Sequence, residues 1–192
     1  MEIKNPAEAP QLSCGERRIL LDIARGAITA AAHNEVYRVP RGLPAALQQP
    51  QGTFVSLHIH GKLRGCIGVL HASRTLAQAV AHCACSAALR DPRFPPLEPQ
   101  ELPETVIEVS VLGCLRLLEH GRMPSPGVDG VMVDQGSQQG LLLPQVATEF
   151  GWDAERLLAE TCHKAGLAPD AWRRGARVRV FQAQVFSEEG AT

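Results

Sequence analysis

A cysteine between two glycines is the feature of this sequence whose residue types most directly indicate chemistry. It is Cys66, in the run Leu-Arg-Gly-Cys-Ile-Gly, and Lys62 and Arg64 precede it at alternate positions. Residues two apart on a β-strand share a face, so we expect Lys62, Arg64 and Cys66 to point the same way. A cation beside a cysteine favours the thiolate, which is the reactive form. Gly65 and Gly68 would let other backbone or a ligand come close.

Two interpretations of the segment Leu63–Gly68 stay open on residue types alone. In the first, Cys66 is a nucleophile or a group that grips a ligand. In the second, it is a small buried hydrophobe beside a bulge glycine, since inert buried thiols are common in proteins.

The loop Asp91–Pro96 is the second candidate. Its prolines stand on both sides of Arg93, and a stiff loop presents a charge at a low entropic cost, which suits a binding site. Alternatively, the prolines only end the preceding helix, and Asp91 and Arg93 form an ordinary surface ion pair.

Glu108 is the third candidate, because it lies inside an apolar strand, two residues before Ser110. A carboxylate in such a place is costly unless it is paired, and Arg64 or Arg93 is the partner we expect. If Glu108 neighbours Cys66, it could act as a general base or as an orienting group. A buried structural ion pair is the alternative.

His58 and His60 share a face of an expected strand, a spacing that can bind a metal. Metal sites need three or four ligands, and the sequence offers no obvious third ligand nearby. We therefore predict no metal site. The sequence also lacks a Gly-x-x-x-x-Gly-Lys phosphate loop and a Gly-x-Gly-x-x-Gly fingerprint, so it indicates no particular cofactor.

A basic cluster occurs near the carboxyl end of the sequence. It consists of Arg173, Arg174, Arg177 and Arg179. The formal net charge of -1 makes a solvated surface the expected interpretation and nucleic-acid binding the weaker one.

Hydrophobic periodicity and capping signals place these residues on elements of both kinds. The expected helices cover residues 13–33, 74–90, 144–150 and 153–164. The expected strands cover residues 53–59, 63–67, 104–118, 130–134, 140–143 and 177–186, with a tight turn at Gly61–Lys62. Several strands pair as hairpins, so we predict an α+β fold with a mainly antiparallel or mixed sheet and flanking helices.

Composition limits the class of protein. The chain has 192 residues, 45% of them hydrophobic, and six cysteines without a Cys-x-x-Cys pair. There is no apolar run long enough to span a membrane, and the first ten residues do not resemble a secretory signal. We therefore expect a cytoplasmic protein whose cysteines are free thiols.

The motifs together resemble those of the AMMECR-type domain family, in particular its bacterial branch, protein A of the AmmeMemoRadiSam system. The resemblance covers about residues 13–188, and Leu-Arg-Gly-Cys-Ile-Gly is its most specific motif. The matching segments are Gly52–Leu57, Leu63–Gly68, Asp91–Pro96, Glu108–Val111, Leu142–Val146 and Lys164–Leu167.

The resemblance implies one domain over residues 13–188, formed of a larger and a smaller lobe with Leu63–Gly68 at a cleft between them. We expect residues 1–12 and 189–192 to be flexible termini. The branch is named for an AMMECR-type, a Memo-type and a radical-SAM protein, so the resemblance also implies association with the latter two. It implies no reaction, but it strengthens the assignment of Arg64 and Cys66 to a functional site.

Three hypotheses of function follow. The chain could be an enzyme, with Cys66 as nucleophile or acid, Arg64 holding an anionic group, and Glu108 orienting or accepting a proton. It could instead be a binding or scaffold module without catalysis, gripping a partner or peptide through Leu63–Gly68. Nucleic-acid binding is the weakest of the three. The binding residues that we predict around the catalytic ones are Gly65, Gly68, Asp91, Arg93 and Ser110.

Overall fold

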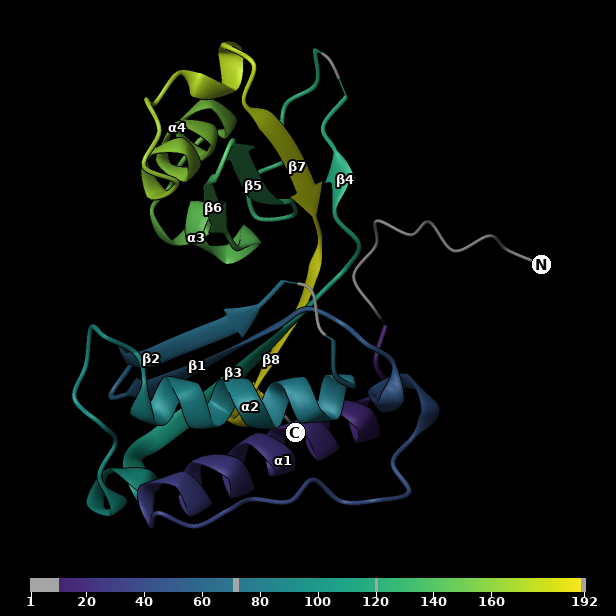
Figure 1. Cartoon of the computed structure of the whole chain (residues 1–192), viewed down its shortest axis with the longest axis vertical. Coiled ribbons are helices and arrows are strands. Elements are labelled where there is room, and N and C mark those ends of the chain that lie inside the picture. Colours follow the sequence, from purple (N-terminus) through teal and green to yellow (C-terminus); the bar gives the residue numbers. More distant parts are fainter. Residues whose placement is uncertain (1–10, 71–72, 120, 191–192) are drawn as a thin grey trace. The chain divides into compact units, whose positions relative to one another are not determined.

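The computed structural model describes residues 11–70, 73–119 and 121–190, and most of the expected flexible termini lie outside them. The chain divides into two compact units, each with one four-stranded sheet (Figure 1). The larger unit comprises Gln11–Leu112 with residues 184–190, and the smaller unit comprises Gly113–Ala183. The predicted α+β class is confirmed, but its strands form two sheets instead of one.

The larger unit begins with helix α1 (Cys14–Ala32), which starts where the sequence predicts. The Glu16 amide donates to the Ser13 hydroxyl at 3.3 Å, and the Ser13 amide donates to the Glu16 carboxylate at 2.8 Å. This reciprocal capping box satisfies two backbone donors that the first turn would otherwise leave unpaired. It also lowers the pKa of Glu16, first through the backbone hydrogen bond at Ser13.

The sheet of the larger unit has the strand order β2 (Lys62–Val69), β1 (Thr53–Ile59), β3 (Thr105–Leu112) and β8 (Ala183–Ser187). Helices α1 and α2 (Leu76–Leu89) cover one face of this sheet (Figure 1). Val55, Leu57, Ile107 and Val109 point into that layer and are fully buried. Because side chains alternate along a strand, Ser56 and Glu108 lie on the opposite face.

The turn of the β1–β2 hairpin is His60–Gly61, one residue earlier than the predicted Gly61–Lys62. Ile59 pairs with Lys62, and the two residues between them have φ angles of 50° and 73°. Two successive residues with positive φ form the turn whose twist matches that of a hairpin. Glycine suits the second position because a side chain is rarely tolerated there.

The smaller unit has the strand order β4 (Arg116–Leu117), β7 (Arg177–Phe181), β5 (Gly130–Gln135) and β6 (Gln138–Leu142). Helices α3 (Pro144–Glu149) and α4 (Ala154–Lys164) pack against it around a core that includes Val131, Leu157 and Val180. Asp153 caps α4 by accepting the Arg156 amide at 2.8 Å, as the sequence predicts.

Short 3-10 helices complete the two units. They are η1 (Ala45–Gln48), η2 (Pro99–Glu104), η3 (Ala171–Arg173) and η4 (Glu188–Gly190). Among the described residues, none of the helices combines the length and the hydropathy needed to cross a bilayer.

Two of the predicted strands each divide between the two sheets. The strand expected over residues 104–118 is β3 followed by β4, and the one expected over residues 177–186 is β7 followed by β8. The Gly113 amide donates to the Gln182 carbonyl at 2.7 Å, where both chain segments change sheet. Apolar alternation continues from Val109 to Leu117 in the first segment, so the hydrophobic period alone could not reveal that change. In the second segment the phase of the alternation shifts at Val180 and Phe181, a signal that the prediction did not use.

Gly65 and Gly68 have different packing partners. A Cβ atom at Gly65 would lie 2.3 Å from the Ala87 carbonyl oxygen, because α2 passes directly over β2. A Cβ atom at Gly68 would lie 2.2 Å from the ring of Phe54. The two glycines that we predicted as binding residues are therefore required by close packing within the larger unit.

We expect Gly65→Ala to lower the free energy of unfolding by about 1–3 kcal/mol, the usual cost of overpacking against an element that cannot move freely. Gly15→Ala is the matched control, because no atom lies within 4 Å of its added Cβ. Gly15 lies in the first turn of α1, where alanine should be neutral or slightly stabilising. Urea denaturation of both variants checks this, and a neutral Gly65→Ala would contradict the packing described.

Candidate functional site

A β-bulge changes the direction of the side chains that precede Cys66. Leu57 pairs with Gly65 and His58 pairs with Leu63, so Arg64 is an extra residue without a partner on β1. The bulge reverses the alternation, so Lys62 lies on the helix-covered face and Cys66 lies on the opposite face with Ser56. The expectation that Lys62, Arg64 and Cys66 share one face is therefore wrong.

The outer edge of β2 is held by the loop that follows α2. The Cys66 amide donates to the Asp91 carboxylate at 2.8 Å, and the Arg93 guanidinium donates to the Cys66 carbonyl at 3.3 Å. Asp91 and Arg93 also form an ion pair at 2.7 Å, and Asp91 is 4% exposed. The side chains of Asp91 and Arg93 thus make the two backbone hydrogen bonds to Cys66 that a neighbouring strand would otherwise make.

These contacts shift the ionisation of both groups. The hydrogen bond from Arg93 is the main cause that holds the pKa of Asp91 far below its usual range, and the amide of Cys66 adds to it. The pKa of Arg93 is raised, first by its hydrogen bond to Asp91, with a smaller contribution from Cys66. Asp91 is therefore a carboxylate at every pH at which the protein would work.

Arg64 binds the remainder of the loop that follows α2. Its guanidinium binds the Glu101 carboxylate through two hydrogen bonds of 2.8 and 2.9 Å, and it donates to the carbonyl oxygens of Pro95 and Pro96. The hydrogen bond from Arg64 is the main cause that lowers the pKa of Glu101. Arg64 and Arg93 thus pair with Glu101 and Asp91, and our expectation that either pairs with Glu108 is wrong.

Cys66, Ser56 and Glu108 form one row across three strands. Ser56 on β1 pairs with Cys66 on β2 and with Glu108 on β3. The Ser56 hydroxyl donates to the Cys66 sulfur at 3.2 Å, and Cys66 is half-buried. Two strand spacings put the Cα atoms of Cys66 and Glu108 roughly 10 Å apart. Glu108 therefore reaches the thiol only across the hydroxyl of Ser56.

Sequence reasoning missed Ser56 as a site residue, although its position one strand away from Cys66 now makes it central. The available signal was its place on the polar face of an alternating strand, together with the hairpin pairing. Ser110, a predicted binding residue, lies on the same face as Glu108 and is 2% exposed. We refer to this side of the sheet as the polar face.

The other cysteines have surroundings unlike those of Cys66. Burial raises the pKa of Cys83 to about 12 and raises the pKa values of Cys85 and Cys162. Cys14 and Cys114 are exposed. Cys66 is thus the cysteine that combines partial exposure with a hydroxyl donor on its sulfur.

The two histidines take separate positions. His60 lies in the hairpin turn, and its Nε2 atom is 3.0 Å from the Glu104 carboxylate. His58 lies on the polar face beside a hollow of about 170 Å³, which Glu108 and Ser187 also line. Within residues 11–70, 73–119 and 121–190, no group of three His, Cys, Asp or Glu side chains is placed to hold a metal ion.

The basic cluster of the smaller unit is paired with carboxylates. Arg173 pairs with Glu155 at 2.8 Å and Arg174 with Asp170 at 2.6 Å. Arg177 and Arg179 both approach Asp134, at 3.8 and 2.5 Å. This pairing favours the solvated-surface interpretation of the cluster over nucleic-acid binding.

Comparison with known proteins places these motifs in a family. The model of the family described as AMMECR1 matches residues 21–186, which include the bulge, the Asp91 loop and the polar face. The chain belongs to the AMMECR1 family.

Its AMMECR1 relatives include archaeal proteins. One from Methanothermobacter thermautotrophicus is 46% identical over 187 residues, which cover 93% of this chain and 97% of the relative. Another from Thermofilum pendens is 41% identical and covers 93% of this chain and 92% of the relative. The crystal structure of an uncharacterized protein from Pyrococcus horikoshii is similar with a TM-score of 0.87 and 37% identity. It covers 94% of this chain and 95% of that one.

In this AMMECR1 chain, we expect Asp91→Asn to lower the free energy of unfolding at pH 7 by about 1–3 kcal/mol, because the charged acceptor of Cys66 and Arg93 is lost. The pKa of Asp91 is depressed by folding, so its stabilisation is present above the unfolded value of about 3.9 and lost as pH falls below it.

The difference in the free energy of unfolding between the wild type and Asp91→Asn should therefore shrink between about pH 4 and pH 2. In this range the unfolded carboxyl becomes protonated while the folded one stays ionised. Asp22→Asn is the control, because Asp22 is exposed. Urea denaturation across this pH range checks both variants. An Asp91→Asn variant as stable as the wild type at pH 7 would show that the edge does not depend on this carboxylate.

Proposed function

We propose that the protein works through the polar face of the larger unit, with Cys66 as the group that reacts. The observation that carries this proposal is the 3.2 Å hydrogen bond from the Ser56 hydroxyl to the Cys66 sulfur. A donor aimed at sulfur is the arrangement that a thiolate nucleophile needs. The backbone of Cys66 is fixed at the same time by Asp91 and Arg93, so the sulfur is held in one place.

The chemistry of this row is nucleophilic substitution by the Cys66 sulfur at an electrophilic carbon, in which the sulfur–carbon bond forms as the bond from that carbon to its leaving group breaks and the leaving group keeps the electron pair. Cys66 supplies the electron pair, Ser56 donates a hydrogen bond to the sulfur, and Glu108 is the carboxylate of the same row. Because Ser56 separates the two, Glu108 would take the thiol proton only after the Ser56 hydroxyl turns round, so that its oxygen accepts the proton from sulfur and its own proton passes to the carboxylate. The role of Arg64 as an anion holder stays a prediction, and its bonds to Glu101 make loop fastening its first task.

Alkylation of the cysteines tests the proposal. We expect iodoacetamide to modify Cys66 at neutral pH at least as fast as the exposed Cys114, although Cys66 is half-buried. Cys83 should remain unmodified up to about pH 9, because its pKa is about 12 and its side chain is buried. Mass spectrometry of each cysteine peptide over pH 6–9 gives the rates.

A Cys66 that reacts only together with Cys83, when the protein unfolds, would remove the thiol proposal. Ser56→Ala provides a second comparison, because it removes the donor on the sulfur. We expect it to slow the alkylation of Cys66 and to leave the rate at Cys114 unchanged.

Docking of protein partners through the same face is the second candidate, and a different observation favours it. Leu63 is 39% exposed and pairs with His58, which places it on the polar face near Cys66. A rigid strand with an exposed apolar side chain suits a partner surface.

The partners that the family resemblance implies are a Memo-type and a radical-SAM protein. Assignment of this chain to the bacterial branch of the family is part of the same proposal. The free cysteines support a cytoplasmic location.

Co-purification with a Memo-type and a radical-SAM protein from the same organism tests this second candidate. We expect Leu63→Asp to reduce capture by tenfold or more, because burying the charge in an interface is costly. Val36→Asp is the matched control, since Val36 is also apolar, is 86% exposed, and lines a hollow with residues of α2 on the helix-covered side. Equal capture of both variants and the wild type would exclude docking through Leu63.

A further inference from the structure

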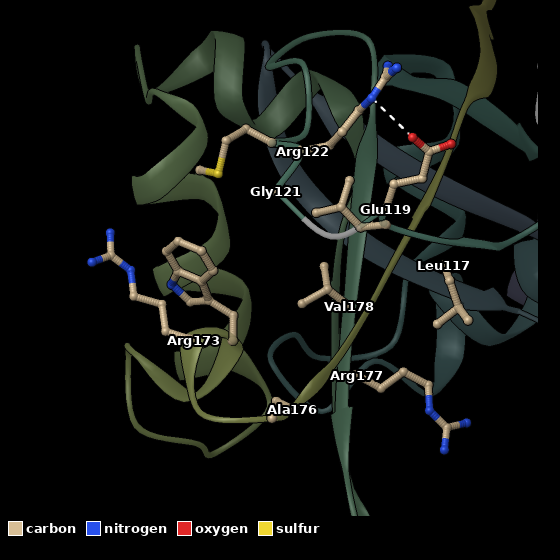
Figure 2. A pocket seen from close by; sticks show the side chains of 12 residues that line it. Leu117, Glu119, Gly121, Arg122, Arg173, Ala176, Arg177 and Val178 are labelled. Carbon is tan, nitrogen blue, oxygen red and sulfur yellow. Dashed lines mark ion pairs between the residues drawn. The ribbon is translucent and has the colours of Figure 1, made fainter.

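The smaller unit contains a pocket that the proposed thiol site does not use. It encloses about 610 Å³ beside strands β4 and β7, within the size range of sites for small molecules. Leu118, Trp172, Ala176 and Val178 supply apolar lining. Figure 2 shows Val178 near the centre of the view, with the side chains of Arg122, Arg173 and Arg177 around it and their guanidinium groups directed outward.

The charged side chains of the lining are three arginines and one glutamate, Glu119. Two further carboxylates, Glu155 and Asp134, pair with Arg173 and Arg177 from outside the lining. A guanidinium offers planar pairs of donors that match the oxygens of a carboxylate, sulfonate or phosphate. Arg173 also lies 4.5 Å from the centre of the Trp172 ring, so one of these donors is positioned against the apolar floor.

The present partners of these arginines are easy to exchange. Arg122 pairs with Glu119 at 3.1 Å, and the two side chains are 75% and 66% exposed. Arg173 pairs with Glu155 at 2.8 Å, with 54% and 66% exposure. Exposed ion pairs of this kind contribute little to stability, so an incoming anion can replace the glutamates at a small cost.

We propose that this pocket binds a small molecule with an apolar, aromatic-sized body and one anionic group. The body lies on Trp172 and Val178, and Arg122 and Arg173 hold the anion after their exposed side chains turn toward it from their glutamate partners. The size of the pocket, its apolar floor and its exchangeable arginines carry this assignment. The pocket selects its ligand by charge as much as by shape, so an uncharged analogue of equal size binds more weakly.

A pair of dyes that differ in charge tests the proposal. Anilinonaphthalene sulfonate has an aromatic body and a sulfonate, and phenylnaphthylamine has a similar body without charge. Trp152 and Trp172 are the two tryptophans of the chain, and Trp152→Phe keeps an aromatic ring beside Phe150 while leaving Trp172 as the single tryptophan reporter. In this background, we expect the sulfonate to quench Trp172 fluorescence and to bind about tenfold or more tightly than the neutral dye.

Variants then assign the contacts. Combined Arg122→Gln and Arg173→Gln should weaken the sulfonate about tenfold or more and leave the neutral dye unchanged. Arg174→Gln is the matched control, because Arg174 is also ion-paired but does not line the pocket. Glu155→Gln should tighten sulfonate binding by up to about fivefold, since it releases Arg173. Circular dichroism confirms that each variant is folded.

Four results would overturn the proposal. The first is equal binding of the two dyes, and the second is a sulfonate affinity that does not change when both arginines are replaced. The third is Trp172 quenching that follows protein concentration without any dye, which would make a second copy of the chain the occupant. Stronger competition by an acidic peptide than by the sulfonate dye would instead assign the pocket to a protein partner and would also overturn it.

Discussion

The hydrogen bond from the Cys66 amide to the Asp91 carboxylate is the interaction on which the candidate site depends. Strand β2 is at the edge of its sheet, so its outward backbone groups have no neighbouring strand. Asp91 and Arg93 bind the amide and the carbonyl of Cys66 from outside. Because Asp91 is buried and its pKa is strongly lowered, this support is charged and keeps its geometry.

This interaction makes the two most specific motifs of the sequence one structural unit. Leu63–Gly68 provides the edge strand, and Asp91–Pro96 with Glu101 provides the loop that closes it. Arg64, Gly65 and Gly68 are occupied by contacts within the larger unit. These residues therefore build a rigid support, and the side chain of Cys66 is the part of the motif that remains available for chemistry on the polar face.

Local signals predicted much of the fold because they act over a few residues. The capping box at Ser13, the cap at Asp153 and the β1–β2 hairpin follow from such signals. A bulge beside Cys66 was one of the two interpretations of the sequence, but its place at Arg64 could not be predicted, because it depends on the register between two strands and the alternation of the sequence passes through it unchanged. The same limit applies to the strand predicted over residues 104–118, which divides between the two sheets.

Sequence reasoning anticipated part of the geometry around Cys66 and missed the rest. Cys66, Glu108 and Ser110 do share a face, but Ser56 was missing from the prediction and Arg64 was given the wrong neighbours. Each error concerns a contact between residues distant in sequence. Arg64 lies 37 positions from Glu101, and Asp91 lies 25 positions from Cys66. Residue types restrict which partners are possible, but only the folded chain selects one.

Hydrogen exchange of the Cys66 amide tests most directly whether Asp91 holds this strand edge. An outward amide on an edge strand exchanges quickly unless something other than a strand accepts its hydrogen bond. If the Asp91 carboxylate is that acceptor, exchange at Cys66 is slow in the wild type and at least about tenfold faster in Asp91→Asn, while amides in the core of α1 are unchanged. Fast exchange at Cys66 in the wild type, or equal rates in the two proteins, would contradict the structural basis proposed for the thiol site.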